Sequence, residues 1–293
     1  VDNPVIIRML YAFLGLFFGA LGTVLNSLLL QYSRPVSTGR IVAVSNMVTM
    51  LFLIFVVGLE AILLEFTHID RETFLFVFSL FLLGAFVWAF IRFPQSLLRT
   101  MFRAYYVFRY NLKVTGNENI PIEGPVLLIG NHTSFIDWIL LQMSSPRPLR
   151  LAMNENKSEH GFFRWVLKLL GAIRINRRNP EPAMEKIRKA LLHGEAVVVF
   201  PEGELAKSCN IGRFSIDYSS AVKDTSARLI PFYIQGVWGG KYSYTDESVN
   251  FGEKTTRIVS IAFGKEVPLE TEPAKLRNIL RELSMSACAK SLS

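Results

Sequence analysis

The chain has 293 residues, of which 51% are hydrophobic and 19% charged, and its mean hydropathy is +0.31. Soluble globular chains carry charge on about a quarter of their residues, so this composition excludes a disordered or fibrous protein and argues against a purely soluble one. The first 98 residues hold five arginines and five acidic residues, and the net charge of +8 therefore belongs entirely to residues 99–293.

The front of the chain contains three long stretches without charge, of 22, 19 and 19 residues. A bilayer core of about 30 Å is crossed by roughly 20 helical residues, so these stretches predict transmembrane helices. The loop at 31–40 has two arginines and no acid, whereas the loop at 66–72 is net acidic. The positive-inside rule then places the chain after residue 92 in the cytoplasm, below a cell inner membrane. The three predicted spans cover about 5–30, 41–64 and 73–93.

The segment 94–110 begins with a proline and interleaves apolar residues with Arg99, Arg103 and Arg109. Arginines one helical turn apart, beside leucine, phenylalanine and tyrosine, are typical of a helix that lies in the membrane interface near anionic head groups. We therefore expect an amphipathic linker helix here. A solvated surface helix is the alternative.

From residue 111 onward the hydrophobic pattern changes to short apolar runs alternating with helical periodicity. Such alternation predicts an α/β domain over residues 111–293, with a mostly buried sheet flanked by helices. The strands are expected at 125–130, 172–175, 196–200, 229–234 and 257–263, and the helices at 162–170, 180–193 and 273–290.

The segment Gly130-Asn-His-Thr-Ser-Phe-Ile-Asp137 follows the first of these buried strands. Loops at strand ends are where α/β proteins place reactive groups. A carboxylate that accepts a proton from one ring nitrogen of a histidine leaves the other nitrogen free as a base. His132 and Asp137 could form such a pair, although a structural histidine and a helix-capping aspartate would fit these residues equally well.

Two further segments carry polar groups suited to a substrate. The turn Pro201-Glu202-Gly203 follows the strand 196–200 directly and is expected to expose the Glu202 carboxylate and nearby backbone N–H groups. The segment 171–177 ends in Arg177, whose guanidinium suits a phosphate. A plain strand-ending turn and a solvated charge are the respective alternatives.

In this order and spacing, the segments NHTSFID, GAIRINR, FPEG and LIPFYI resemble the four motifs of the glycerolipid acyltransferase family, over residues 104–270. The likeness is greatest to the acyltransferase module of the bifunctional acyl-carrier-protein synthetase/2-acylglycerophosphoethanolamine acyltransferase. The front of the chain, especially residues 26–46, resembles the last helices of a major-facilitator lysophospholipid transporter. The resemblance thus implies fused transporter and acyl-ligase domains in a longer protein.

The resemblance also implies a reaction and its residues. His132 would take the proton of a glycerol hydroxyl as that hydroxyl attacks an acyl thioester, and Asp137 would orient His132. Arg177 and the Glu202-Gly203 turn would bind the acceptor. Asn131 would shape the histidine turn. The family uses no metal and no bound cofactor; its co-substrate is an acyl thioester of acyl-carrier protein or coenzyme A.

One position departs from the family pattern. The FPEG turn of the family continues with arginine or Thr-Arg, whereas Glu204 follows here and the next cation is Lys207, which joins the expected acceptor-binding residues. An acid beside an anionic phosphate is unfavourable, so the hypothesis is that Glu204 favours an acceptor with a cationic ethanolamine head group.

These patterns predict a membrane-bound lysophospholipid acyltransferase acting on 2-acylglycerophosphoethanolamine. A 1-acylglycerol-3-phosphate acyltransferase is the alternative acceptor class, and a lysophospholipid transporter fragment with a silent soluble domain is the alternative of another kind. The basic surplus suits anionic lipid head groups and an acidic carrier protein. Nucleic acid is excluded as a partner because the sequence has no recognisable nucleic-acid-binding motif and because the predicted membrane spans argue against it.

Overall fold

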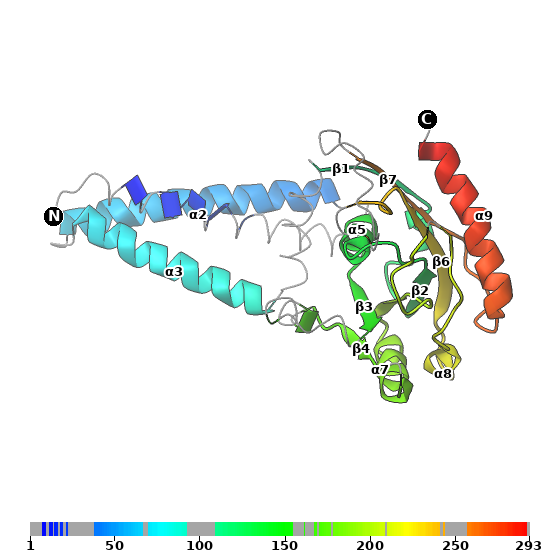
Figure 1. Ribbon diagram of the computed structural model, residues 1–293. Helices are drawn as coiled ribbons and strands as arrows, with labels where there is room; N and C mark the ends of the chain where they lie inside the picture. The colour runs from blue at the N-terminus through cyan, green and yellow to red at the C-terminus, as the bar shows by residue number, and fades with distance from the viewer. Residues whose placement is uncertain are drawn as a thin grey trace. The chain divides into compact units, whose positions relative to one another are not determined.

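The computed structural model describes residues 38–66, 70–92, 109–154, 170–176, 178–208, 210–240 and 257–291, with residues 161, 167, 168 and 243 and single positions between 8 and 22 (Figure 1). The chain divides into two compact units, residues 1–100 and 101–293.

The first unit contains two long apolar helices, α2 (Thr38–Phe66) and α3 (Arg71–Arg92). Both are long and apolar enough to cross a membrane, over Val42–Phe66 and Arg71–Arg92. The side chain of Asp70 caps α3 by accepting hydrogen bonds from the backbone N–H and the hydroxyl of Thr73, at 3.0 and 2.8 Å. Two of the three expected spans are therefore present as helices. The first, at 5–30, lies mostly outside the described residues, as does the expected linker helix.

The second unit is built on a seven-stranded mixed sheet with the order β1-β7-β6-β2-β5-β3-β4. Strands β6 and β7 pair antiparallel, and all other neighbours pair parallel. The parallel centre places the carboxyl ends of β2, β5 and β6 at one edge of the sheet. The strands are β1 (Tyr110–Thr115), β2 (Val126–Gly130), β3 (Leu149–Asn154), β4 (Ile173–Ile175), β5 (Ala196–Val199), β6 (Arg228–Gln235) and β7 (Arg257–Phe263).

The apolar runs of the sequence predict the central strands correctly, because β2 and β5 are buried along their whole length. Strands β1 and β3 are not predicted from the sequence pattern. In β3 the apolar run is interrupted by Arg150, whose guanidinium pairs with Glu195 at 2.9 Å and donates to the carbonyl of Gly171 at 2.6 Å. A charged residue in a strand is tolerated here because its partners lie close by in space.

Helices α7 (Glu181–Leu192) and α9 (Pro273–Ser291) confirm the expected helices at 180–193 and 273–290. They pack with α8 (Ser219–Val222) against the sheet, because apolar residues of α7, α8, α9, β2, β4, β5 and β6 share one buried cluster. Helix α5 (Asp137–Ser144) has almost every residue buried and lies across the sheet from α9 (Figure 1). The expected helix at 162–170 lies mostly outside the described residues.

Tyr218 places a hydroxyl in this core without a hydrogen-bond partner in the described part of the chain. Burial raises its pKa to about 12. Tyr218→Phe removes that unsatisfied group and keeps the ring, so the free energy of unfolding should stay unchanged or rise by about 1 kcal/mol. Denaturant unfolding of the two proteins measures this. A clear loss of stability in the variant would contradict the prediction.

Candidate active site

Two loops meet where the parallel strands β2 and β5 end. Ile129 and Val199 are paired in the sheet, so the residues that follow each strand emerge side by side at the same edge. The end of β2 requires glycine, because a Cβ at Gly130 would stand 2.4 Å from the ring of Phe232 on β6. The resulting loops, 131–137 and 200–208, hold most of the residues that the sequence singles out.

The first loop contains the predicted histidine–aspartate pair. The Nδ1 atom of His132 lies 3.0 Å from Oδ2 of Asp137. The same oxygen accepts the backbone N–H groups of Thr133 and Ser134, at 2.6 and 2.8 Å. Asp137 is fully buried, whereas the His132 side chain is 17% exposed. Asp137 accepts from the histidine ring and from two backbone N–H groups, and this arrangement places the proton of His132 on Nδ1.

Phe200, at the end of β5, fixes the plane of the histidine ring. The two rings stack at a centroid separation of 4.1 Å and an interplanar angle of 17°. Phe232 in turn meets Phe200 edge-on, at 5.9 Å and 83°. The imidazole is therefore held by a hydrogen bond at one nitrogen and by an aromatic surface on one face. The sequence pattern does not predict this role of Phe200; the available signal is an aromatic residue at the junction between the strand and the Pro-Glu-Gly turn.

Glu202 joins the two loops through its side chain. Its Oε1 accepts the backbone N–H of His132 at 3.2 Å, and its Oε2 accepts that of Gly212 at 2.9 Å. A Cβ at Gly212 would come within 2.7 Å of this carboxylate, so only glycine allows the approach. The backbone N–H of Ala206 completes the junction by donating to the carbonyl of His132 at 2.7 Å. The peptide of His132 is thus bound on both sides by the second loop.

The expectation of an exposed Glu202 carboxylate is wrong, because the side chain is buried. Its carboxylate accepts the backbone N–H groups of His132 and Gly212, which would otherwise be left without these partners. The geometry therefore makes Glu202 a positioning residue for His132.

Burial raises the pKa of Glu202 above its ordinary value of 4.5, and the N–H groups of Gly212 and His132 oppose the shift. A pKa raised by folding means that the folded state binds more protons, so this group costs stability as the pH rises from 4.5 through the folded pKa. Glu202→Gln removes that titration. We expect the free energy of unfolding of the variant, relative to that of the wild type, to increase as the pH rises across this range. Denaturant unfolding at several pH values measures this difference. Parallel pH profiles would contradict this.

Asn131 is turned toward β6. Its Oδ1 accepts the N–H of Ile234, and its Nδ2 donates to the carbonyl of the same residue, both at 2.8 Å. The amide therefore extends the sheet pairing beyond the end of β2 and shapes the histidine loop. Its polar atoms already have partners in the protein.

The remaining predicted residues are spread over the second loop and beyond it. Gly203 adopts a φ of 69°, which favours glycine, and its N–H donates to the carbonyl of Phe200 at 3.0 Å. Lys207 is exposed on the same loop. Arg177 lies outside the described residues. Within the described ranges, no group of three or more histidine, cysteine, aspartate or glutamate residues could hold a metal ion.

Comparison with known proteins finds a family model that matches this part of the chain. Residues 111–235, which contain both loops, match the model of the acyltransferase family. The chain is 26% identical over 187 residues to a 1-acyl-sn-glycerol-3-phosphate acyltransferase of Chlamydomonas reinhardtii, covering 62% of the chain and 53% of that protein. It is 31% identical over 123 residues to the enzyme of that name from Pseudomonas aeruginosa, covering 41% of the chain and 47% of that protein. The chain thus spans about half the length of these relatives.

The fold is similar to that of a solved structure. The crystal structure of the 1-acyl-sn-glycerophosphate acyltransferase from Thermotoga maritima superposes with a TM-score of 0.50 and 16% identity, covering 84% of this chain and 92% of that one. This likeness confirms the α/β acyltransferase fold with helices flanking a sheet. The family model and the names of these relatives all denote acyltransferases.

Proposed function

We propose that this protein is a glycerolipid O-acyltransferase that moves an acyl group from a thioester donor to the free hydroxyl of 1-acylglycerol-3-phosphate. The observation that carries the proposal is the His132–Asp137 pair, joined at 3.0 Å within the segment that matches the acyltransferase family. A base held by a buried carboxylate is what activation of a glycerol hydroxyl at neutral pH requires.

The geometry supports the following sequence of steps. Asp137 keeps the proton of His132 on Nδ1, so Nε2 is the free base. Nε2 takes the proton of the acceptor hydroxyl as its oxygen attacks the thioester carbonyl carbon. The tetrahedral intermediate then expels the thiolate as the carbonyl re-forms. The proton on Nε2 passes to the departing sulfur, which gives a free thiol, an ester and the original imidazole.

The names of the relatives favour 1-acylglycerol-3-phosphate over 2-acylglycerophosphoethanolamine as the acceptor. The expectation of an ethanolamine acceptor rests on Glu204 and on the resemblance to a bifunctional enzyme, and the comparisons give no support to fused transporter or ligase domains. The donor is an acyl thioester. Both the coenzyme A and the acyl-carrier-protein forms fit the chemistry of the His132 loop.

The apolar helices suit an enzyme whose acceptor is a membrane lipid. Helices α2 and α3 are proposed to anchor the chain in the bilayer, with the α/β unit on the cytoplasmic side. This arrangement would bring the lysolipid to the enzyme by diffusion within the membrane.

The test is an acyl-transfer assay on the full chain in detergent or membranes, with palmitoyl-coenzyme A and palmitoyl-acyl-carrier protein as donors. Lysophosphatidate and lysophosphatidylethanolamine are offered as acceptors. We expect phosphatidate to be the main product. Preferential formation of phosphatidylethanolamine would overturn the acceptor proposal, and the absence of any diacyl product would overturn the enzyme proposal.

A further inference from the structure

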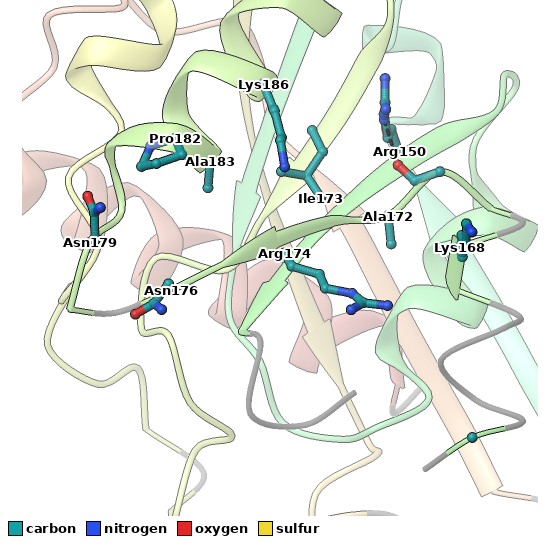
Figure 2. A pocket seen from close by; sticks show the side chains of 12 residues that line it. Arg150, Lys168, Ala172, Ile173, Arg174, Asn176, Asn179, Pro182, Ala183 and Lys186 are labelled. Carbon is teal, nitrogen blue, oxygen red and sulfur yellow. Dashed lines mark hydrogen bonds between the residues drawn. The ribbon is translucent and has the colours of Figure 1, made fainter. Parts of the chain in front are cut away.

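A basic groove runs along β4, the last strand of the sheet, between the segment 168–171 and the start of α7. Its volume is about 930 Å³. Figure 2 shows Lys186 beside Ile173, and Arg174 projecting from the other side of the strand toward Lys168. Four of the described residues that line the groove are cationic and none is acidic: Arg150, Lys168, Arg174 and Lys186.

Three of these four cations are available to a ligand. The guanidinium of Arg150 is used by Glu195 and Gly171 and forms part of the wall. Among the described residues, the side chains of Lys168, Arg174 and Lys186 have no ion-pair or hydrogen-bond partner. Cations gathered around a hollow without acidic neighbours repel one another unless an anion lies between them. The groove is therefore suited to phosphate groups.

The sheet register gives the position of this groove relative to the proposed base. Ile129 of β2 pairs with Val199, Val199 with Ala152, and Ala152 with Ile173 of β4. Arg174, one residue further along, is thus level with the end of β2. Three strand spacings separate β2 from β4, which amounts to about 14 Å across the sheet. The groove runs from the residues just before β4 to those just after it, and its Arg174 part lies about this distance across the sheet from the strand that leads to His132.

The separation distinguishes between the two phosphate-bearing substrates. In a lysophosphatidate acceptor, a short glycerol linkage places the phosphorus only about 5 Å from the hydroxyl that must reach His132. In a thioester donor, the pantetheine arm between sulfur and phosphorus is about as long as four extended residues, roughly 15 Å. The acceptor phosphate is too close to the reacting atoms to occupy the groove, whereas the donor phosphate reaches it.

We infer that the groove along β4 binds the phosphate end of the acyl donor, through Lys168, Arg174 and Lys186. The inference rests on the proposed function, because it requires the thioester carbonyl to lie at His132. Coenzyme A and acyl-carrier protein both carry a phosphate at the end of their pantetheine arm, and this phosphate is the group that the groove would bind. Coenzyme A adds further phosphates beyond it, and these would also lie among the three cations.

The test removes the three cations together, as Lys168→Ser, Arg174→Ser and Lys186→Ser in the full chain. Three donors are compared: palmitoyl-coenzyme A, palmitoyl-acyl-carrier protein and palmitoyl-pantetheine, which lacks phosphate. We expect kcat/KM to fall about tenfold or more with the phosphorylated donors, since each cation–phosphate contact contributes part of the binding energy. The kcat/KM with palmitoyl-pantetheine and the KM for lysophosphatidate should both stay unchanged.

A matched control removes three exposed lysines elsewhere in the same unit, as Lys223→Ser, Lys265→Ser and Lys275→Ser. It loses the same net charge and should keep wild-type kinetics with every donor. A loss with palmitoyl-coenzyme A alone supports the site and assigns it to coenzyme A.

Other outcomes overturn the inference. One is an equal fall in kcat/KM with palmitoyl-pantetheine, and another is an unchanged kcat/KM with every donor. A fall in kcat/KM with palmitoyl-acyl-carrier protein alone, or a raised KM for lysophosphatidate, would also overturn it. If the wild type transfers no acyl group, the proposed function fails on its own. Equilibrium dialysis of coenzyme A against His132→Ala and the triple variant then still tests the groove, with binding expected only to His132→Ala.

Discussion

Alanine in place of His132 is expected to reduce acyl transfer by about a thousandfold or more, because it removes the only proposed proton acceptor for the glycerol hydroxyl. The fold should persist. The hydrogen bonds that the His132 backbone makes with Glu202 and Ala206 do not involve the imidazole. Asp137 still accepts hydrogen bonds from the backbone N–H groups of Thr133 and Ser134. Initial rates with saturating donor and acceptor measure the loss, and circular dichroism checks the fold.

His193→Ala is the matched control. His193 is exposed at the end of α7, where its Nδ1 lies 2.6 Å from the carbonyl of Lys189. This variant should keep wild-type rates. Acyl transfer by His132→Ala at more than a tenth of the wild-type rate would show that another group accepts the proton, and the catalytic role given to His132 would be wrong.

Asparagine in place of Asp137 is expected to lower kcat by about a thousandfold to ten-thousandfold with little change in KM. The asparagine oxygen can still accept the N–H groups of Thr133 and Ser134, so the start of α5 should form. The amide nitrogen, however, donates toward Nδ1 of His132. The imidazole then carries its proton on Nε2 and ceases to be a base at the position that faces the substrate.

The readout that separates orientation from folding is the division of the effect between kcat and KM. Asp217→Asn serves as the control, because Asp217 is exposed and its side chain also accepts a backbone N–H two residues on, from Ser219 at 2.9 Å. Nearly normal kcat in Asp137→Asn would mean that Asp137 only caps α5. An unfolded Asp137→Asn protein would equally contradict the expectation that the loop survives.

The sequence predicts those parts of the molecule in which neighbouring residues decide the structure. The central strands β2 and β5 are short, uninterrupted apolar runs. Such runs indicate buried strands, so the sequence pattern alone predicts them. The histidine–aspartate pair is predictable for the same reason. Its members are five residues apart and belong to one loop at a strand end, and the structure brings them to 3.0 Å.

Features that depend on distant partners were not predictable. A glutamate in a Pro-Glu-Gly turn is normally solvated, and only Gly212 and the N–H of His132 make its burial favourable. The stacking of Phe200 on His132 requires two strands to be adjacent, which periodicity does not reveal. Strand β3 escaped prediction because the partner of Arg150 is 45 residues away.

The double attachment of the His132 peptide also bears on the order in which the protein assembles. His132 and Asp137 are synthesised early and form a local loop, but the groups that hold the histidine backbone belong to residues 202 and 206. A growing chain that ends before residue 200 already contains the base and its carboxylate, but the imidazole lacks the ring of Phe200 and the backbone of His132 lacks those bonds. Catalytic competence should therefore arise only when β5 inserts between β2 and β3. Slow amide exchange at His132 and Ala206 would report that moment.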